Sequence, residues 1–332
     1  MEPKNQVNLP IFFSIGIPAY KAKFLKECID SIFAQTYTNF ELIIVNDASP
    51  ENIDEIVHQY SDERIQYYVN IQNVGAEHVV DNWNKCLSYA KGDYFILMGD
   101  DDKMEPQYLD EFTKLIDKYP DLNVYHCRSY IINEESQKIA LTRSWPEFES
   151  VYDNMWHRIN YCRNQYISDF VYKRNVLVEQ GGFYKLPLAW ASDDISAYIA
   201  MKNKGIAHIN IPLLNYRVNA QTISLTGSPK LKLKAVLLEE KWFLSFLKQV
   251  PEKDIDKIIH SSICKTKSVF FYERKVFFIV QLLNEQFMKN LLFWLINGKK
   301  NGVTKRVVYK AFLIFIKVQD SFISKLLLDY EK

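Results

Sequence analysis

The 332-residue chain contains few of the residues that interrupt or cross-link a fold. It has 10 glycines and 11 prolines, against 21 Phe, 21 Tyr and 6 Trp residues, so little of it can be flexible linker. Its five cysteines are an odd number with no Cys-x-x-Cys pair, which argues against a disulfide framework and a cysteine zinc site. Hydrophobic residues make up 48% of the chain and charged residues 24%, which is typical of a folded globular protein.

Long apolar runs are also missing. A helix that crosses a bilayer needs about 20 apolar residues in succession. The longest uncharged runs in the C-terminal part, 276–284 and 290–298, are far shorter. The N-terminus lacks the basic start and the small-residue cleavage site of a signal peptide, and Pro10 and Pro18 interrupt its apolar stretch. We therefore expect a cytoplasmic protein without membrane spans.

Two common catalytic signatures are absent. The six histidines show no HExxH or other paired spacing, so none is expected to bind a metal. The segment after the first predicted strand reads Gly16-Ile-Pro-Ala-Tyr-Lys21, which lacks the GxGxxG pattern of nicotinamide-dependent dehydrogenases. These absences argue against a histidine metal site and against a nicotinamide-dependent dehydrogenase.

Charge is distributed unevenly along the chain. Residues 1–229 contain 21 Lys and Arg and 30 Asp and Glu, whereas residues 230–332 contain 20 and 10. The composition changes after Ser228-Pro229, so we place a boundary near 229 between a catalytic domain and a basic, apolar, helical tail. Such a tail fits peripheral contact with an anionic membrane, a homo-oligomer interface or a cap on the catalytic domain, and these alternatives stay open. The acidic body argues against nucleic-acid binding.

The first 120 residues alternate between strand and helix patterns. Continuous apolar runs predict buried strands over 11–17, 40–45, 64–69 and 94–98. Apolar residues at helical spacing predict helices over 24–33 and 79–90. This alternation predicts an α/β sandwich with a mainly parallel central sheet. Residues 121–229 show a looser pattern of shorter strands and loops, which suits loops that build a pocket.

Polar segments follow the four predicted strands. They are Pro18-Ala19-Tyr20, Asn46-Asp47-Ala48-Ser49, Asn73-Val74-Gly75 and Asp100-Asp101-Asp102. Ligands bind at the carboxyl ends of the strands in open parallel sheets, so all four segments should face one edge.

Three successive aspartates repel one another, so folding them together requires something that offsets their charge. In an extended segment Asp100 and Asp102 would point to one face and could share a divalent cation with hard oxygen ligands. A cation held by so few carboxylates usually completes its coordination with substrate phosphates. The alternative is a solvated turn.

Taken together, these motifs resemble the family 2 glycosyltransferases of GT-A fold. The resemblance rests on Ile15-Gly-Ile-Pro-Ala-Tyr20, Gln35-Thr-Tyr37, Phe40 to Ser49, Asn73-Val-Gly75 and Ala90 to Asp102, and covers about residues 10–225. It implies a nucleotide-diphosphate-sugar donor, Mn²⁺ or Mg²⁺ at a DxD motif and inversion at the anomeric carbon.

The resemblance also implies roles for single residues. Pro18, Ala19 and Tyr20 would lie along the nucleoside, Asp47 would bind the base and Asn73 would form a turn beside the nucleotide. Asp100 and Asp102 would hold the metal and, through it, the diphosphate. Asp101, which we also count among the donor-binding residues, stands where the family usually has a small residue, so the pair that holds the metal stays open. The resemblance assigns nucleotide binding to about 10–120 and acceptor binding to about 121–229.

An inverting transfer also needs a carboxylate that takes the proton from the acceptor hydroxyl. Ala191-Ser-Asp-Asp194 resembles the acidic pair that begins a helix in the family, so Asp194 is the expected base and Asp193 its helper or alternative. The alternative is that both residues only cap the helix, because acidic residues are favoured at helix N-termini. We expect the triplet and Asp194 to converge on one crevice.

Two residues near position 217 have alternative interpretations. Arg217 suits either a phosphate contact or a structural salt bridge. Asn219 stands where many relatives have His, so if that His ligates the metal, Asn219 either supplies a weaker oxygen ligand or makes no contact with the metal. Trp145, Trp156 and Trp190 suit either stacking on acceptor sugars or core packing.

The sequence therefore predicts a hexosyl- or N-acetylhexosaminyltransferase that uses a nucleotide sugar, preferably a UDP-sugar. Its acceptor would be a glycan or a lipid-linked glycan in surface polysaccharide synthesis, with the enzyme at the inner face of the plasma membrane. The alternative is a non-catalytic protein of the same fold that binds nucleotide sugars or glycans.

Overall fold

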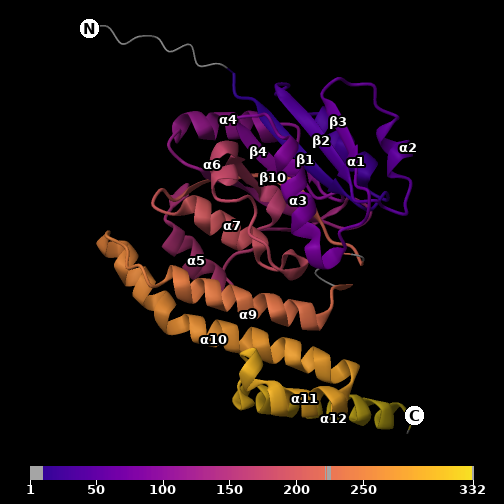
Figure 1. Ribbon diagram of the computed structural model, residues 1–332, viewed down its shortest axis with the longest axis vertical. Helices are drawn as coiled ribbons and strands as arrows, with labels where there is room; N and C mark the ends of the chain where they lie inside the picture. The colour runs from indigo at the N-terminus through magenta and orange to yellow at the C-terminus, as the bar shows by residue number, and fades with distance from the viewer. Residues whose placement is uncertain (1–9, 221, 223–225, 331–332) are drawn as a thin grey trace. The chain divides into compact units, whose positions relative to one another are not determined.

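The computed structural model describes residues 10–220, 222 and 226–330, and the chain divides into two compact units (Figure 1). The first unit comprises Met1–Lys185 and Ser192–Thr222 and is a mixed α/β domain. The second comprises Leu186–Ala191 and Ile223–Lys332 and is helical in its described part. Helix α9 of the second unit begins at Pro229.

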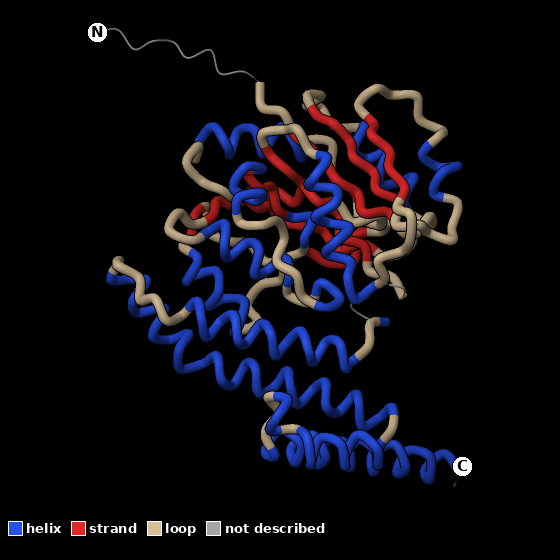
Figure 2. Tube along the Cα trace, viewed as in Figure 1, coloured by secondary structure: helices blue, strands red, loops and turns tan. Residues whose placement is uncertain are grey.

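The first unit is built on one sheet with helices on both sides (Figure 2). The strand order is β3-β2-β1-β4-β9-β6-β10-β5, with β7 paired to β6 and β8 paired to β10. The strands are β1 Phe13–Ala19, β2 Phe40–Asn46, β3 Ile65–Val69, β4 Tyr94–Leu97, β5 Lys103–Met104, β6 Val124–Ile132, β7 Lys138–Leu141, β8 Phe148–Glu149, β9 Phe170–Lys173 and β10 Ile206–Arg217.

The helices of this unit are mostly short. They are α1 Leu25–Phe33, α2 Ile53–Val57, α3 Val79–Tyr89, α4 Tyr108–Lys118, α5 Val151–Ile159, α6 Arg174–Glu179 and α7 Ser192–Met201, with 3₁₀ turns η1 Ala76–His78 and η2 Ile167–Asp169.

Side-chain alternation along β1 explains the two layers. Phe13, Ile15 and Ile17 are fully buried in the core that α1 and α4 cover. Gly16 faces the opposite side, where a Cβ atom would lie 2.8 Å from the Cβ of Cys86 on α3. The missing side chain therefore lets α3 approach the sheet closely.

The prediction of an α/β domain with a parallel sheet core is confirmed, since β1 pairs in parallel with β2 and β4, and β2 with β3. The expectation of only shorter strands after residue 121 is wrong. β6 has nine residues and β10 twelve, and they pair in parallel with register shifts around Pro212. A proline inside a strand breaks the ladder and hides the strand pattern.

The second unit contains η3 Pro187–Ala189, α9 Pro229–Phe246, α10 Asp254–Glu285, α11 Phe287–Asn297, η4 Lys299–Asn301 and α12 Lys305–Tyr330. Two ion pairs join α9 to α10, Arg274 with Glu239 at 2.6 Å and Lys275 with Glu240 at 2.7 Å. Among the described residues, none of the helices has both the length and the hydropathy that a bilayer crossing requires.

Candidate active site

The predicted polar segments meet at one edge of the sheet. β1 to β4 are parallel, so Tyr20, Asp47 and the triplet Asp100–Asp102 follow strands that end at the same edge. β10 ends there too, because it runs parallel to β6, and β9 lies antiparallel between β6 and β4. Arg217, the last residue of β10, therefore reaches the triplet.

Asp47 is buried and organises the loop after β3. Its Oδ1 accepts hydrogen bonds from Asn70 Nδ2 at 2.7 Å and from the backbone N–H of Val74 at 3.1 Å. Lys85 Nζ donates to Asn70 Oδ1 at 2.6 Å, which completes the network. Within the described part of the chain no group donates to Asp47 Oδ2, so this oxygen can receive a ligand N–H. Ala48 has φ +47°, a strained value for a non-glycine residue beside this carboxylate.

The segment around Tyr20 is joined to two other loops of the site. The backbone N–H groups of Tyr20 and Lys21 both donate to Asp100 Oδ2 at 2.8 Å. Ser49 Oγ donates to the carbonyl oxygen of Tyr20 at 2.5 Å. Pro18 is half-buried and Ala19 buried, whereas the Tyr20 side chain is exposed. These contacts join the predicted nucleoside segment to the triplet and to the loop after β2.

Asn73 forms the predicted turn. Its side-chain Oδ1 accepts a hydrogen bond from the backbone N–H of Gly75, and Gly75 has φ +78°, which glycine adopts without strain.

The triplet forms a turn rather than an extended segment. The N–H of Asp102 donates to the carbonyl oxygen of Gly99 at 3.3 Å. Asp102 is only 3% exposed, and its two oxygens accept hydrogen bonds from Ser168 Oγ at 2.7 Å and from the N–H of Arg217 at 3.0 Å. Asp101 is half-buried and accepts a hydrogen bond from Asn219 Nδ2 at 2.7 Å. The alternation expected for an extended segment, with Asp100 and Asp102 on one face, is therefore not formed.

Negative charge accumulates in the triplet. Burial and the charge of Asp101 raise the pKa of Asp100 to about 6, although two backbone N–H groups oppose the shift. Burial and Asp101 also raise the pKa of Asp102 well above its usual range. The positive charge of Lys21 also opposes the rise at Asp100. Clustered carboxylates provide the hard oxygen donors that Mn²⁺ and Mg²⁺ bind.

Arg217 is committed to the protein itself. Its side chain is fully buried and covers the ring of Phe24 at 4.1 Å. The guanidinium donates to the backbone oxygens of Asp101, Asn133 and Glu134 and to Glu27 Oε2, at 2.8 to 3.1 Å. Of the two predicted roles the structural one fits, and the phosphate contact does not. Arg217 instead positions the backbone of the triplet.

The acidic pair occupies the first turn of α7. Asp194 is 8% exposed and receives a bidentate contact from Arg158, with Nε at 3.1 Å from Oδ1 and an Nη atom at 2.7 Å from Oδ2. Gln165 Nε2 also donates to Oδ1, at 2.5 Å. Asp193 is half-buried, and its Oδ1 accepts a hydrogen bond from the N–H of Asp194 at 2.9 Å. The capping alternative therefore fits Asp193, whose side chain accepts a backbone hydrogen bond at the start of the helix. Asp194 is held by side chains instead.

Asp193 titrates near neutral pH. Burial and the negative charge of Asp194 raise its pKa to about 7, and the charge of Arg158 opposes this rise. A carboxylate with a pKa near the working pH can both accept and release a proton.

A pair of tyrosines links the triplet to the acidic pair. The rings of Tyr166 and Tyr216 stack with centroids 3.6 Å apart and planes 10° apart. Burial and the charges of Asp102, Asp101 and Asp193 all raise the pKa of Tyr216. Burial and Asp102 also raise the pKa of Tyr166 to about 12, whereas Arg158 opposes the shift. Asp102 therefore acts on both hydroxyls, whereas Asp193 acts on that of Tyr216, which is the group that both carboxylate clusters influence.

Comparison with known proteins identifies the family. The sequence profile described as "Glycosyl transferase family 2" matches residues 14–180, about half of the chain. The chain belongs to this family. The match covers β1 to β9 and includes every predicted donor-side residue except Arg217, while α7 lies beyond it.

Relatives and solved structures agree with this family assignment. Glycosyltransferase GlyA of Streptococcus pneumoniae is 25% identical over 233 residues, 65% of this chain and 32% of that protein. Hyaluronan synthase of Pasteurella multocida is 29% identical over 145 residues, 43% of this chain and 15% of the synthase. The chain thus spans a third or less of the length of these two relatives. The structure of S. aureus TarS 1-349 in complex with UDP-GlcNAc has a TM-score of 0.65 at 14% identity over 94% of this chain and 92% of that one, which shows a shared fold.

Sequence reasoning missed the residues that hold the glycosyltransferase site together. Arg158 lies near the end of α5, Gln165 and Tyr166 lie in the loop that follows, and Ser168 lies in η2. None of the four belongs to a motif that the sequence analysis recognised. Tyr216 lies beside Arg217 in a segment that the sequence analysis considered, but no role was predicted for its hydroxyl.

The tryptophans differ in their surroundings. Trp145 is buried, stacks on His126 with centroids 4.1 Å apart and has Arg163 above it at 4.8 Å, so it serves packing. Trp190 belongs to the second unit and contacts Phe278. Trp156 lies half-buried on α5 beside His157.

One further cluster has the side chains of a metal site. Ligand atoms of Glu149, Asp153 and His157 lie within 4.8 Å of one another. Glu149 is already neutralised by Arg163 and contacts His208 Nε2 at 3.3 Å. A cation there would compete with a buried arginine.

Proposed function

We propose that this glycosyltransferase moves a hexosyl or N-acetylhexosaminyl group from a UDP-sugar to a glycan or lipid-linked acceptor in surface polysaccharide synthesis. The observation that carries the proposal is the Tyr216 hydroxyl, which is influenced by the triplet and by Asp193 and whose ring stacks on Tyr166. The similarity to hyaluronan synthase supports a polysaccharide product. The UDP-GlcNAc complex of TarS and the open oxygen of Asp47 support a uridine donor.

The donor side would bind the nucleotide along the ends of β1 to β4. Asp47 Oδ2 would accept the base N–H, and Tyr20 would lie beside the nucleoside. Asp100 and Asp101 would hold Mn²⁺ or Mg²⁺, because both oxygens of Asp102 already accept hydrogen bonds. The cation would supply positive charge to the diphosphate. This assignment differs from the Asp100 and Asp102 pair that the DxD resemblance implies.

The acceptor side would supply the base. Asp194 would take the proton from the acceptor hydroxyl. The hydroxyl oxygen would form a bond to the anomeric carbon while the bond between that carbon and the diphosphate breaks. A single displacement of this kind inverts the anomeric configuration. Arg158 and Gln165 fix the orientation of the Asp194 carboxylate. Asp193, with its pKa raised to about 7, is the alternative base.

A screen of UDP- and GDP-sugars with Mn²⁺, with Mg²⁺ and with a chelator tests the proposal. We expect metal-dependent release of UDP and, with an oligosaccharide acceptor, a product whose anomeric proton shows the inverted configuration by NMR. Asp194→Asn should abolish transfer and keep donor binding by calorimetry. Binding without turnover in every condition would instead identify a non-catalytic binding protein.

A further inference from the structure

Helix α11 has apolar side chains on two opposite faces. On one face Trp294 is buried, and Phe287 stacks on Phe315 of α12 with ring centroids 4.7 Å apart. On the other face the exposed side chains recur at helical spacing, and Ile296 alone is 77% exposed. This exposed apolar face consists of Met288, Leu292, Leu295 and Ile296. A helix that is apolar on all sides normally has all sides covered.

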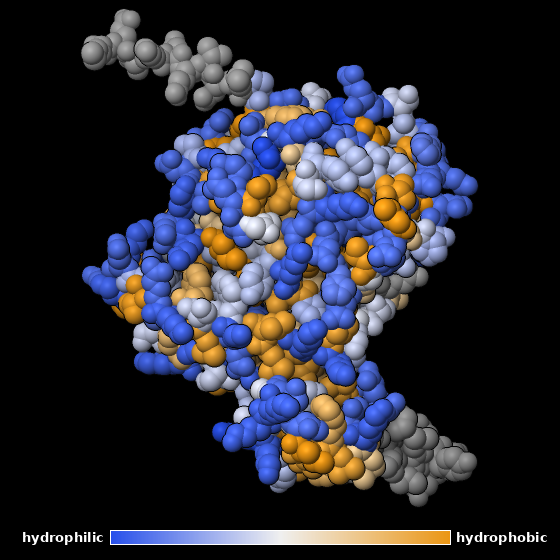
Figure 3. Space-filling model, in the orientation of Figure 1, coloured by the Kyte–Doolittle hydropathy of each residue, from blue (hydrophilic) through white to orange (hydrophobic). Residues whose placement is uncertain are grey.

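The exposed apolar face belongs to a segment of the chain that is rich in positive charge. Residues 286–319 contain seven cationic side chains and no Asp or Glu. Within the described part of the chain none of the seven forms an ion pair, in contrast to Arg274 and Lys275 on α10. Where Figure 1 labels α11, Figure 3 shows an orange surface flanked by blue. The seven are Lys289, Lys299, Lys300, Lys305, Arg306, Lys310 and Lys317.

We propose that the exposed apolar face of α11 docks the chain onto an anionic lipid surface. Aliphatic side chains need an apolar phase, the surrounding cations need phosphate, and a lipid surface offers both. The inference goes beyond the proposed function, because docking requires no sugar transfer. The helix would lie on the lipid surface and not cross it, since α11 has only eleven residues.

A second copy of the chain fits this face poorly. A two-fold interface would bring the same cations together without an acidic partner among residues 286–319. Four aliphatic side chains are also far fewer than the roughly 20 residues per side of a stable interface. A nucleic acid would satisfy the cations but would leave the aliphatic face exposed to water.

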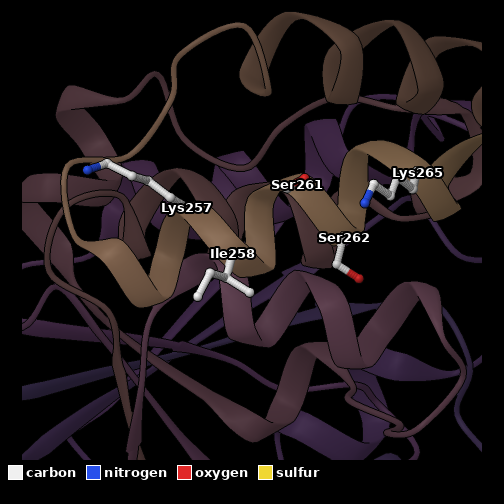
Figure 4. A pocket seen from close by; sticks show the side chains of 5 residues that line it. All are labelled: Lys257, Ile258, Ser261, Ser262 and Lys265. Carbon is white, nitrogen blue, oxygen red and sulfur yellow. The ribbon is translucent and has the colours of Figure 1, made fainter.

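Helix α10 offers a matched comparison within the same unit. A surface depression of about 430 Å³ on this helix is lined by Lys257, Ile258, Ser261, Ser262 and Lys265 (Figure 4). Only one of these side chains is aliphatic, so this face cannot cover a lipid surface in the same way. Ile255 and Ile258 are 67% and 71% exposed, which makes them controls for a general loss of surface hydrophobicity.

Sedimentation of the full chain with vesicles tests the proposal. We expect binding to phosphatidylcholine vesicles that contain phosphatidylglycerol, weak binding to phosphatidylcholine alone, and a steep decrease with salt. Leu292→Gln with Ile296→Gln should weaken binding at least tenfold, and Lys299→Gln with Lys300→Gln roughly 30-fold. The matched controls, Ile255→Gln with Ile258→Gln and Lys241→Gln with Lys248→Gln, should bind within about twofold of the unchanged chain.

Several results would overturn the proposal. They are equal binding to neutral and anionic vesicles, no binding to either, and an equal loss in the α10 control variant. A concentration-dependent dimer that Leu292→Gln with Ile296→Gln dissociates would assign the face to a second copy instead. Circular dichroism of each variant establishes that the helical unit is folded.

Discussion

The two carboxylate clusters of the site differ in the groups that stabilise their negative charge. The triplet Asp100–Asp102 receives its hydrogen bonds from uncharged donors, namely backbone N–H groups, Ser168 and Asn219. Asp194 instead has a guanidinium built in, Arg158, at 2.7 Å. Asp194 is therefore held by a cationic side chain, whereas the hydrogen bonds to the triplet come from neutral groups, which suits the cation that we propose for it. This difference separates donor binding, which should depend on metal, from base positioning, which should not.

Asp101→Asn should have the largest effect on this comparison. It removes charge from the half-buried member of the triplet and, under our assignment, a cation ligand. We expect kcat/KM to fall roughly 10³-fold and Mn²⁺-dependent donor binding to disappear in calorimetry. Asp102→Asn is the matched control, because its oxygens accept internal hydrogen bonds, and it should mainly lower the thermal midpoint. Loss of donor binding only in Asp102→Asn would restore the Asp100 and Asp102 assignment.

Asp194→Asn should have the next largest effect and should leave donor binding intact. Removing the base should lower kcat by about 10² to 10⁴-fold while donor affinity stays within about twofold. The neighbouring substitution Asp193→Asn keeps Asp194 and removes a like charge, so it should retain most activity. If Asp193→Asn abolishes turnover and Asp194→Asn does not, Asp193 is the base.

Arg158→Gln sharpens the comparison through the pH profile. If Asp193 is the base, kcat/KM of the unchanged chain should decrease as pH falls below about 7, because the Asp193 carboxylate then binds a proton. Without the guanidinium the charged form of the pair is less favoured, so this limb should move to higher pH. A limb that stays in place would show that Arg158 does not act on the base. Arg158→Lys should restore part of the profile, since it keeps the charge and loses the bidentate contact.

The sequence predicted the parts of the fold that depend on local patterns. β1, β2 and α1 occur within two residues of their predicted bounds, because continuous apolar runs and a 3.6-residue period are local signals. β10 was missed as a long strand, since Pro212 interrupts its pattern and its partner β6 lies about 80 residues earlier. Pairing over such a distance leaves no local trace.

The same limit applies to the site. The residue types and spacing of Asp100–Asp102 and Asp193–Asp194 are visible in the sequence. Which carboxylate turns inward is not, because that depends on Ser168, which comes from a segment without periodicity. Arg158 is likewise 36 residues away from Asp194. Sequence therefore predicts the chemical groups, and tertiary contacts decide their roles.

A buried cluster around His208 contrasts with the two carboxylate clusters, because its effect should be on stability. His208 is buried, with His126 Nδ1 at 3.3 Å from its Nδ1 and Glu149 Oε1 at 3.3 Å from its Nε2. Burial lowers its pKa to about 4, although Glu149 opposes the shift. Arg163, from another element, also faces this cluster and lowers the pKa further. In the unfolded chain His208 would titrate near 6.5.

The sign of the stability change follows from these pKa values. As pH falls from about 6.5 to about 4, the unfolded chain binds a proton that the folded chain does not, so stability decreases. At pH 5 the loss should be about 2 kcal/mol relative to neutral pH, measured by urea unfolding followed through near-UV circular dichroism. His208→Gln should flatten this slope whatever its stability at pH 7, and Arg158→Gln should leave it unchanged. An unchanged slope in His208→Gln would place the acid sensitivity in the carboxylates of the site instead.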